Sequence, residues 1–183
     1  MDKPIIVFIT GLSGAGKSTL VNYFNDHPIS NWVVYDYDYG KHSPPEDITQ
    51  HDEWREKQTK WFFDQALENS KHDKNTLIIG RSMMPDKTFK LAKDYGWDEG
   101  NIHFGLLYCG PDERKKRIFD RGTAHNWRGH LPEYDEFHSE IRKYTEFEVD
   151  TQQTNLEDTV KKVVNWIMLL EISPDHNLAK VRR

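Results

Sequence analysis

The sequence predicts a three-layer α/β/α fold in which helices cover both faces of a five-stranded, mainly parallel sheet. Short apolar segments alternate along the chain with longer segments of helical periodicity, and this alternation requires right-handed crossovers between parallel strands. A glycine-rich segment joins the first strand to the first helix, at the edge of such a sheet where ligands bind. The five strands are expected at 5–10, 31–36, 76–80, 102–108 and 147–150.

Helical periodicity fills the intervals between these strands. The longest such segment has Trp54, Trp61, Phe62 and Ala66 at three- and four-residue spacings, as in a helix with one buried face. Between 121 and 131 the periodicity stops, and we expect a mobile lid there. The polar tail, 174–183, is expected to be frayed. The helices are expected at 17–25, 48–70, 86–95, 111–120, 132–145 and from 155 to just before 174.

Composition limits the function classes that remain. The 183 residues, 36% of them hydrophobic, suit one well-buried domain, expected over 1–183. The net charge of -5 gives no overall positive field for nucleic acid or anionic lipid. No apolar run approaches the ~20 residues of a membrane span, and the single cysteine, Cys109, excludes an internal disulfide. We expect a cytoplasmic monomer or homodimer without a membrane or nucleic-acid partner.

The glycine-rich segment fits the G-x-x-x-x-G-K-[ST] pattern of a phosphate-binding loop, between a strand and a helix as that loop requires. Its glycines let successive N–H groups point at phosphate oxygens, and the helix N-terminus adds positive potential. The pattern assigns Lys17 to the terminal phosphates and the Ser18 hydroxyl to Mg²⁺. A nucleoside triphosphate is therefore expected to contact Gly11, Ser13, Gly14, Ala15, Gly16, Lys17, Ser18 and Thr19.

Two carboxylates follow the second predicted strand. Asp36 and Asp38 are two residues apart, so both leave the sheet on the same face if the strand pairing continues. One carboxylate can hold Mg²⁺, directly or through water, while the other accepts or aligns the proton of an attacking hydroxyl. We expect Asp36 to serve the metal and Asp38 to serve as the base. The alternative is an ordinary polar turn.

The third predicted strand ends in Gly80-Arg81 and has no acid there. Many phosphate-loop proteins place a second magnesium carboxylate at this point, so here the carboxylate must come from Asp36 or Asp38. Gly80 would let an acceptor approach the backbone, and Arg81 can clamp an anionic or polyhydroxyl group. The alternative for Arg81 is a surface ion pair.

Arginines lead into the expected lid. Arg114, Arg117 and Arg121 recur at three- and four-residue spacing, and thus lie on one helical face. Phosphoryl transfer spreads charge over equatorial oxygens, and arginines carried by a closing lid neutralise it while water is excluded. We expect Arg117 to bind the nucleotide and Arg121 to act in catalysis. The alternative, a solvated charge stripe, suits the intervening Lys115 and Lys116.

Together these landmarks resemble the small-molecule kinase branch of the phosphate-loop fold, in particular shikimate kinase and gluconate kinase, over about residues 4–170. Asp36-Tyr37-Asp38 is similar to the Asp-x-Asp of shikimate kinase, and Trp54-Arg55 to its acceptor-binding aromatic-Arg pair. The Arg-x-x-Arg run at Arg114 and Arg117 is similar to that of both families. The resemblance implies the strand order 2-3-1-4-5, with Arg117 near the adenine and Arg121 at the lid.

The resemblance also implies that the segment containing Asp150 helps to hold the adenine base. Arg81 and Ser82 replace the second and third glycines that follow the third strand in shikimate kinase. Neither the Arg-Pro lid sequence of shikimate kinase nor the His-Phe-Met run of gluconate kinase is present. Neither named substrate is therefore supported.

The sequence thus predicts an ATP- and Mg²⁺-dependent kinase that phosphorylates a hydroxyl of a small molecule. Three alternatives stay open: a nucleoside monophosphate kinase, a polynucleotide 5′-end kinase, and a regulatory phosphate-loop ATPase or switch without a small acceptor. The expected catalytic residues are Lys17, Asp38 and Arg121, the expected metal ligands are Ser18 and Asp36, and the expected acceptor-binding residues are Asp36, Asp38, Arg55, Gly80 and Arg81.

Overall fold

The computed structural model describes residues 4–122 and 134–172. Most of the expected lid and the whole tail, 174–183, lie outside these ranges. The described chain forms a five-stranded sheet of order β2-β3-β1-β4-β5, in which every neighbouring pair is parallel. This confirms the predicted sheet and strand order. The strands are β1 (Ile6–Thr10), β2 (Trp32–Asp36), β3 (Asn75–Ile79), β4 (Ile102–Tyr108) and β5 (Phe147–Asp150).

Each predicted helix is present within the described residues. The long helix begins later than expected, at His51, because residues 48–50 form a 3₁₀ turn before it. The α-helices are α1 (Lys17–Asp26), α2 (His51–Ser70), α3 (Pro85–Asp94), α4 (Pro111–Asp120), α5 (Tyr134–Arg142) and α6 (Leu156–Ile172). The 3₁₀ helices are η1 (Tyr37–Tyr39), η2 (Ile48–Gln50) and η3 (Glu99–Asn101).

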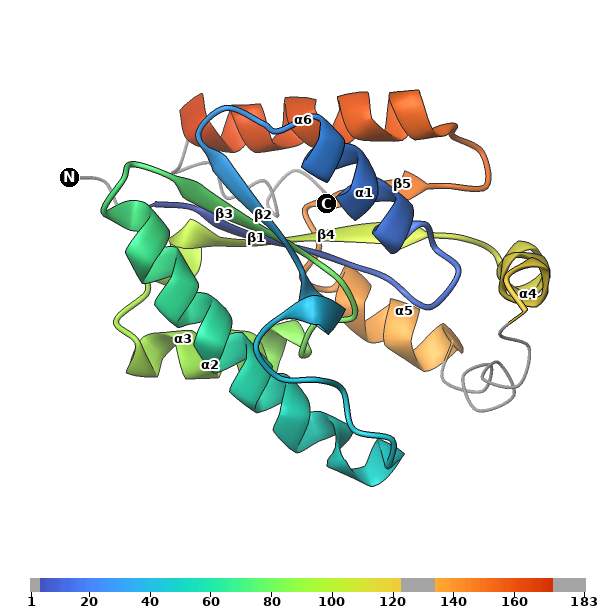
Figure 1. Ribbon diagram of the computed structural model, residues 1–183, viewed down its shortest axis with the longest axis horizontal. Coiled ribbons are helices and arrows are strands. Elements are labelled where there is room, and N and C mark those ends of the chain that lie inside the picture. Colours follow the sequence, from blue (N-terminus) through green and yellow to red (C-terminus); the bar gives the residue numbers. More distant parts are fainter. Residues whose placement is uncertain (1–3, 123–133, 173–183) are drawn as a thin grey trace.

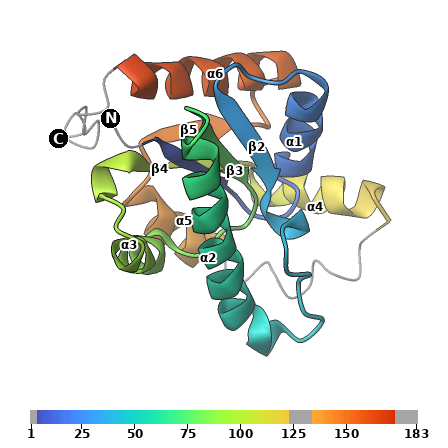
Figure 2. The same cartoon turned by 60° about the vertical axis from the view of Figure 1, so that its left-hand side comes forward.

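The helices form two layers around the sheet. Figure 1 shows α1 and α6 on one face and α2, α3 and α5 on the other, with α4 beyond the carboxyl end of the sheet. Figure 2 shows the N-terminal end of α2 extending past the sheet. The carboxyl ends of the strands, the start of α1 and the start of α2 thus lie toward one edge of the molecule.

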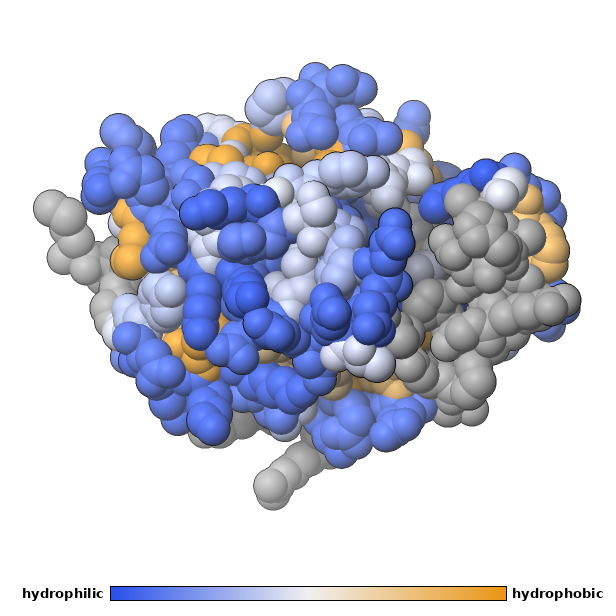
Figure 3. Space-filling view, turned by 60° about the horizontal axis from the view of Figure 1, so that its bottom comes forward, coloured by the Kyte–Doolittle hydropathy of each residue, from blue (hydrophilic) through white to orange (hydrophobic). Residues whose placement is uncertain are grey.

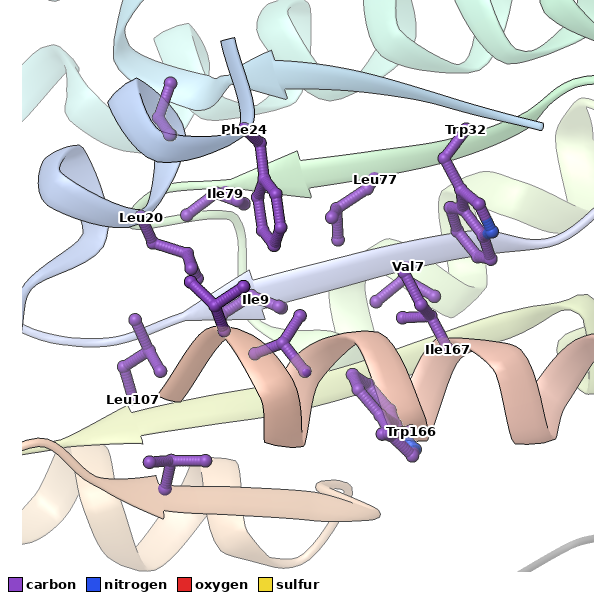
Figure 4. Packing of buried hydrophobic residues seen from close by; sticks show 14 of the residues in the cluster. Val7, Ile9, Leu20, Phe24, Trp32, Leu77, Ile79, Leu107, Trp166 and Ile167 are labelled. Carbon is purple, nitrogen blue, oxygen red and sulfur yellow. The ribbon is translucent and has the colours of Figure 1, made fainter. Parts of the chain in front are cut away.

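Strand side chains alternate between the two layers, as pleating requires. Val7 and Ile9 point toward α1 and α6 and pack with Phe24, Trp166 and Ile167 (Figure 4). Ile6 and Phe8, which alternate with them along β1, are fully buried and point toward the other layer. Phe8 stacks on Phe104 with ring centroids 5.2 Å apart, on the side covered by α2 and α3.

The molecular surface over α2 and α3 is mainly hydrophilic (Figure 3). On α2, Lys57 pairs with Glu53 at 2.6 Å and Lys60 pairs with Glu56 at 2.7 Å, both at four-residue spacing. None of the helices within 4–122 and 134–172 has the length and hydropathy of a membrane span.

Candidate active site

The loop between β1 and α1 has the backbone geometry of an anion site. The Ala15 N–H donates to the Leu12 carbonyl at 3.1 Å, which closes a turn. Gly14 and Gly16 have φ of 85° and 90°, a left-handed region that glycine adopts without steric cost. Because α1 begins directly after Gly16, its free N–H groups and positive end face the loop.

Helix α4 packs directly against this loop. A Cβ at Gly14 would lie 3.1 Å from the Arg114 carbonyl oxygen, so only glycine permits this approach. The Arg114 side chain is 1% exposed, and its Nε donates to the Ser13 carbonyl at 2.8 Å. Sequence reasoning placed Arg114 on the arginine face but gave it no role. The available signal was its position one turn before Arg117, in the same motif.

Arg117 connects the loop to the turn after β5. Its guanidinium donates to the Gly14 carbonyl at 3.3 Å, to the Thr151 hydroxyl at 3.1 Å and to the Thr151 carbonyl at 2.8 Å. Its Nε pairs with Glu113 at 2.8 Å. The Thr151 hydroxyl also donates to the Ala15 carbonyl at 3.2 Å. The loop, α4 and the β5–α6 turn are therefore held as one unit.

A pocket of about 560 Å³ opens beside this unit. Arg117 and Arg121 line the pocket from the α4 side. Gly16 lines it from the loop, and Thr19 lines it from α1. The β5–α6 turn supplies mostly amide and hydroxyl side chains, which suit the polar edge of a ligand. From that turn the pocket is lined by Thr151, Gln152, Gln153, Thr154, Asn155 and Leu156.

Asp150 has a local role in the same turn. Its carboxylate accepts the N–H of Gln152 at 2.9 Å, so it stabilises the backbone that carries the pocket residues. Thr151, in the same expected segment, lines the pocket, and the contact of this segment with an adenine base stays a prediction.

Lys17 bends back over the loop, where its Nζ donates to the Leu12 carbonyl at 3.0 Å. The pKa of Lys17 is lowered to about 8, mainly by burial and also by the charges of Arg81 and Arg114, while Asp38 and Asp36 act in the opposite direction. All four charged groups must lie near Lys17 for this to occur. The structure thus brings the loop lysine together with the two expected carboxylates and with Arg81.

The two carboxylates reach this position by a turn. Pairing of β2 with β3 ends at Asp36 and Ile79, where the strand was expected to end, and the chain then enters η1. The condition under which both carboxylates would leave the sheet on the same face, continued strand pairing to Asp38, is therefore not met. A strand cannot continue because Asp36 caps the 3₁₀ turn: its Oδ1 accepts the Asp38 N–H at 2.9 Å. Burial raises the pKa of Asp36, whereas Asp38 is exposed.

Tyr37, between these carboxylates, is fully buried and joins three elements. Its hydroxyl donates to the Arg55 carbonyl at 2.8 Å and lies 2.8 Å from the Thr59 hydroxyl, both on α2. Gln58 Nε2 donates to the Tyr37 carbonyl at 2.8 Å. A Cβ at Gly80 would lie 2.1 Å from the Tyr37 Cβ. Gly80 is therefore required for packing against Tyr37, which fills the space expected to admit an acceptor.

Two arginines flank this junction. Arg55 is largely buried, and burial, followed by the charge of Arg81, lowers its pKa. The Arg81 guanidinium lies over the Phe137 ring, 5.7 Å from its centroid. The charge of Arg81 acts on both Lys17 and Arg55. Of the two arginines expected to bind an acceptor, Arg81 is therefore the one whose charge reaches the loop lysine.

Trp54 and Trp32 have structural roles. Trp54 is 8% exposed, and its indole N–H donates to the His42 carbonyl at 2.7 Å, which fixes the chain after η1. Trp32 is 5% exposed and donates to Glu171 at 2.9 Å. Neither ring offers a stacking face for a nucleic-acid base, and Trp127 lies outside the described residues.

Substitution of Gly80 tests the contact between β3 and η1. Gly80→Ala should lower the free energy of unfolding by about 1–3 kcal/mol, because the new methyl group overlaps the buried Tyr37. Urea denaturation followed by circular dichroism measures this change. Gly100→Ala is the matched control, since a Cβ there meets no atom within 4 Å. Equal stability of the two variants would contradict the packing described here.

No protein-family model matches the sequence, and no curated protein matches it. Solved structures of similar fold include the tunicamycin resistance protein of Deinococcus radiodurans (TM-score 0.61, 16% identity, 90% of this chain and 95% of that chain). The Mycobacterium tuberculosis APS kinase CysC, in complex with AMPPNP and APS, has a TM-score of 0.59 at 17% identity, over 92% and 99% of the two chains. A gluconokinase from Sinorhizobium meliloti 1021 has a TM-score of 0.59 at 17% identity, over 93% and 95%.

These identities are too low to carry an activity from one protein to another, whereas TM-scores of 0.59 to 0.61 establish the shared fold. The sheet order and the helices on both faces match that fold as the sequence predicted. The chain has the fold of the phosphate-loop kinases that act on small molecules.

Proposed function

We propose that the protein is an ATP- and Mg²⁺-dependent kinase that transfers the γ-phosphate to a hydroxyl of a small molecule. The observation that carries this proposal is the backbone geometry of the phosphate loop, with Lys17 bent over it and within electrostatic reach of Asp38 and Arg81. Transfer of a phosphoryl group to a hydroxyl requires a cation that binds the phosphates, a carboxylate that reaches the hydroxyl, and a second cation.

The nucleotide spans two parts of the site. The loop amides and Lys17 hold the β- and γ-phosphates, and the nucleoside enters the 560 Å³ pocket beside α4. Arg117 and Arg121 line that pocket, and in this proposal Arg121 also neutralises charge on the transferred group. The APS kinase of the same fold was solved with the nucleotide analogue AMPPNP, which supports nucleotide binding here.

The residues near the loop fit Mg²⁺. No cluster of three or more His, Cys, Asp or Glu side chains able to hold a metal occurs in 4–122 and 134–172. Magnesium usually keeps several waters and binds through one or two protein oxygens plus substrate phosphates. Ser18, exposed on the first turn of α1, and Asp36 would supply those oxygens. When bound, the ion neutralises charge that develops on the phosphate oxygens.

The acceptor approaches from the η1 side. Its hydroxyl oxygen attacks the γ-phosphorus, the bond from that phosphorus to the bridging β–γ oxygen breaks, and ADP leaves. Asp38 takes or aligns the hydroxyl proton. Arg55 and Arg81, beside the Tyr37 junction, bind the remainder of the acceptor.

The defining experiment measures ATP consumption with Mg²⁺ against sugars, sugar acids, nucleosides, nucleoside monophosphates and short oligonucleotides. We expect one hydroxyl compound to raise turnover well above the acceptor-free rate. Lys17→Ala protein is the blank. Stimulation by a nucleoside monophosphate or an oligonucleotide end alone would redirect the acceptor assignment, and steady hydrolysis unaffected by every compound would favour the ATPase or switch.

Replacing the proposed base separates chemistry from binding. Asp38→Asn should reduce kcat by about 10²- to 10⁴-fold, since it removes the proton acceptor, while ATP affinity changes little. Steady-state kinetics and a nucleotide titration measure the two quantities. Asp64→Asn, an exposed carboxylate on α2, is the control. An unchanged kcat in Asp38→Asn would remove Asp38 from this role.

Nucleotide affinity should fall at alkaline pH. The pKa of Lys17 is about 8 in the free protein, and bound phosphates raise it because they favour the ammonium form. Below about pH 7 Lys17 is already protonated and the dissociation constant is flat. Above about pH 8 binding must take up a proton, so the dissociation constant should rise by up to about tenfold per pH unit.

The Lys17→Arg variant supplies the comparison for this profile. A guanidinium stays charged across the range, so its dissociation constant should show no such rise, whatever its absolute value. Isothermal titration of Mg²⁺ with a non-hydrolysable ATP analogue measures both proteins. Parallel profiles would show that another group controls the pH dependence.

A further inference from the structure

Helix α4 holds two consecutive carbonyl oxygens of the phosphate loop. The Ser13 carbonyl accepts the Nε–H of Arg114 at 2.8 Å, and the Gly14 carbonyl accepts a guanidinium N–H of Arg117 at 3.3 Å. Arg114 is 1% exposed, so its contact is made away from water, where a charged donor binds a carbonyl strongly. Unlike Arg117, Arg114 does not line the 560 Å³ pocket. Its contribution to a ligand must therefore pass through the loop.

The next carbonyl of the loop is held from the β5–α6 turn. The Thr151 hydroxyl lies 3.2 Å from the Ala15 carbonyl oxygen and 3.1 Å from the Tyr108 carbonyl oxygen. A hydroxyl has one proton, so these two oxygens share it. We therefore expect the contact of Thr151 with the loop to be weaker than that of Arg114, which has a charged donor.

These contacts set the direction of the N–H groups of the loop. The peptide bonds of the described chain are trans, and in a planar trans peptide the carbonyl and the N–H of the next residue point in opposite directions. When α4 holds the Ser13 carbonyl, the Gly14 N–H points away from α4. When Thr151 holds the Ala15 carbonyl, the direction of the Gly16 N–H is set in the same way.

The two glycine N–H groups are available to a ligand. Within 4–122 and 134–172, no hydrogen-bond acceptor meets the N–H of Gly14 or of Gly16. The N–H of Ala15, between them, is already bound to the Leu12 carbonyl at 3.1 Å. Gly14 is buried, and a buried N–H without an acceptor costs free energy unless a ligand oxygen accepts it. The contacts with α4 and Thr151 keep the loop in this form.

We propose that Arg114 is a positioning residue for the triphosphate: by holding the Ser13 carbonyl, it keeps the Gly14 N–H directed into the anion site before the ligand arrives. This rests on the phosphate-binding part of the proposed function and is independent of the acceptor. Without the guanidinium, rotation of the peptide between Ser13 and Gly14 would turn a carbonyl oxygen toward the phosphates. Preorganisation raises affinity because the loop is ordered on folding and not on binding.

Tripolyphosphate, which has no nucleoside, tests the loop alone. Arg114→Met keeps most of the side-chain volume and removes the donors, and it should weaken the binding of Mg²⁺-tripolyphosphate by about tenfold or more, as expected for a lost hydrogen bond from a charged group. Arg114→Lys retains a charged donor and should recover part of the affinity. Thr151→Val should weaken binding only a few-fold, because the lost proton was shared. Calorimetry measures all four proteins.

Two variants control for charge and for stability. Lys116→Met makes the same charge change at an exposed position of α4 and should bind tripolyphosphate as the wild type does. Trp32→Phe removes the hydrogen bond from the indole to Glu171 at the amino end of β2, so it shows what a loss of stability alone does to binding. Urea denaturation gives the stability of each variant. Wild-type affinity in Arg114→Met, or an equal loss in Trp32→Phe, would overturn the proposal.

The ligand-free protein gives a second readout, which attraction between Arg114 and the phosphates would not move. NMR relaxation of ¹⁵N-labelled glycine measures the order parameter of the Gly14 N–H, which is about 0.85 for a rigid amide. It should fall in Arg114→Met and recover in Arg114→Lys. Gly100, where a Cβ would meet no atom within 4 Å, should be unchanged in every variant.

Failure of the proposed function is distinguishable from failure of this inference. If the wild type binds neither tripolyphosphate nor a Mg²⁺–ATP analogue, the kinase assignment fails, and a lowered Gly14 order parameter in Arg114→Met would still show that Arg114 sets the direction of this N–H. If the wild type binds both ligands and Arg114→Met matches it in affinity and in order parameter, the kinase assignment stands and this inference is wrong.

Discussion

The close packing of α4 against the phosphate loop is the contact on which the rest of the site depends. The buried Arg114 holds the Ser13 carbonyl, and Arg117 holds the Gly14 carbonyl and Thr151. A strand-turn-helix connection alone does not need these contacts. They fix the loop in the form that points its N–H groups at an anion, and they set one wall of the neighbouring pocket.

The acceptor side has its own anchor in Tyr37. Its hydroxyl, carbonyl and ring are held by α2 and by the space at Gly80. Asp36 and Asp38 are therefore displayed from a short turn whose centre is buried. The loop is held by α4 and the β5–α6 turn, whereas Tyr37 is held by α2. A shift of α4 therefore does not by itself displace the two carboxylates. Charges from both parts of the site act on the amino group of Lys17: Arg114 from α4, and Asp36 and Asp38 from the end of β2 and η1.

Much of the fold followed from local patterns. Apolar runs predicted the strands, and proline at Pro85 and Pro111 marks helix starts in the structure. The strand order did not follow from spacing, because parallel strands joined by helices can be ordered in several ways; it came from the resemblance. The sequence also left open whether strand pairing continues to Asp38, because periodicity alone does not reveal that Asp36 caps a turn.

The sequence by itself determined the phosphate loop, because a run of glycines, a lysine and a hydroxyl residue carries its chemistry in consecutive positions. Tertiary structure decided which distant charges share the site. Arg114 becomes the buried support of the loop, 101 residues from its partner Ser13, and the charge of Arg81 acts on both Lys17 and Arg55. Burial and electrostatic coupling depend on distances in space, which sequence separation does not contain.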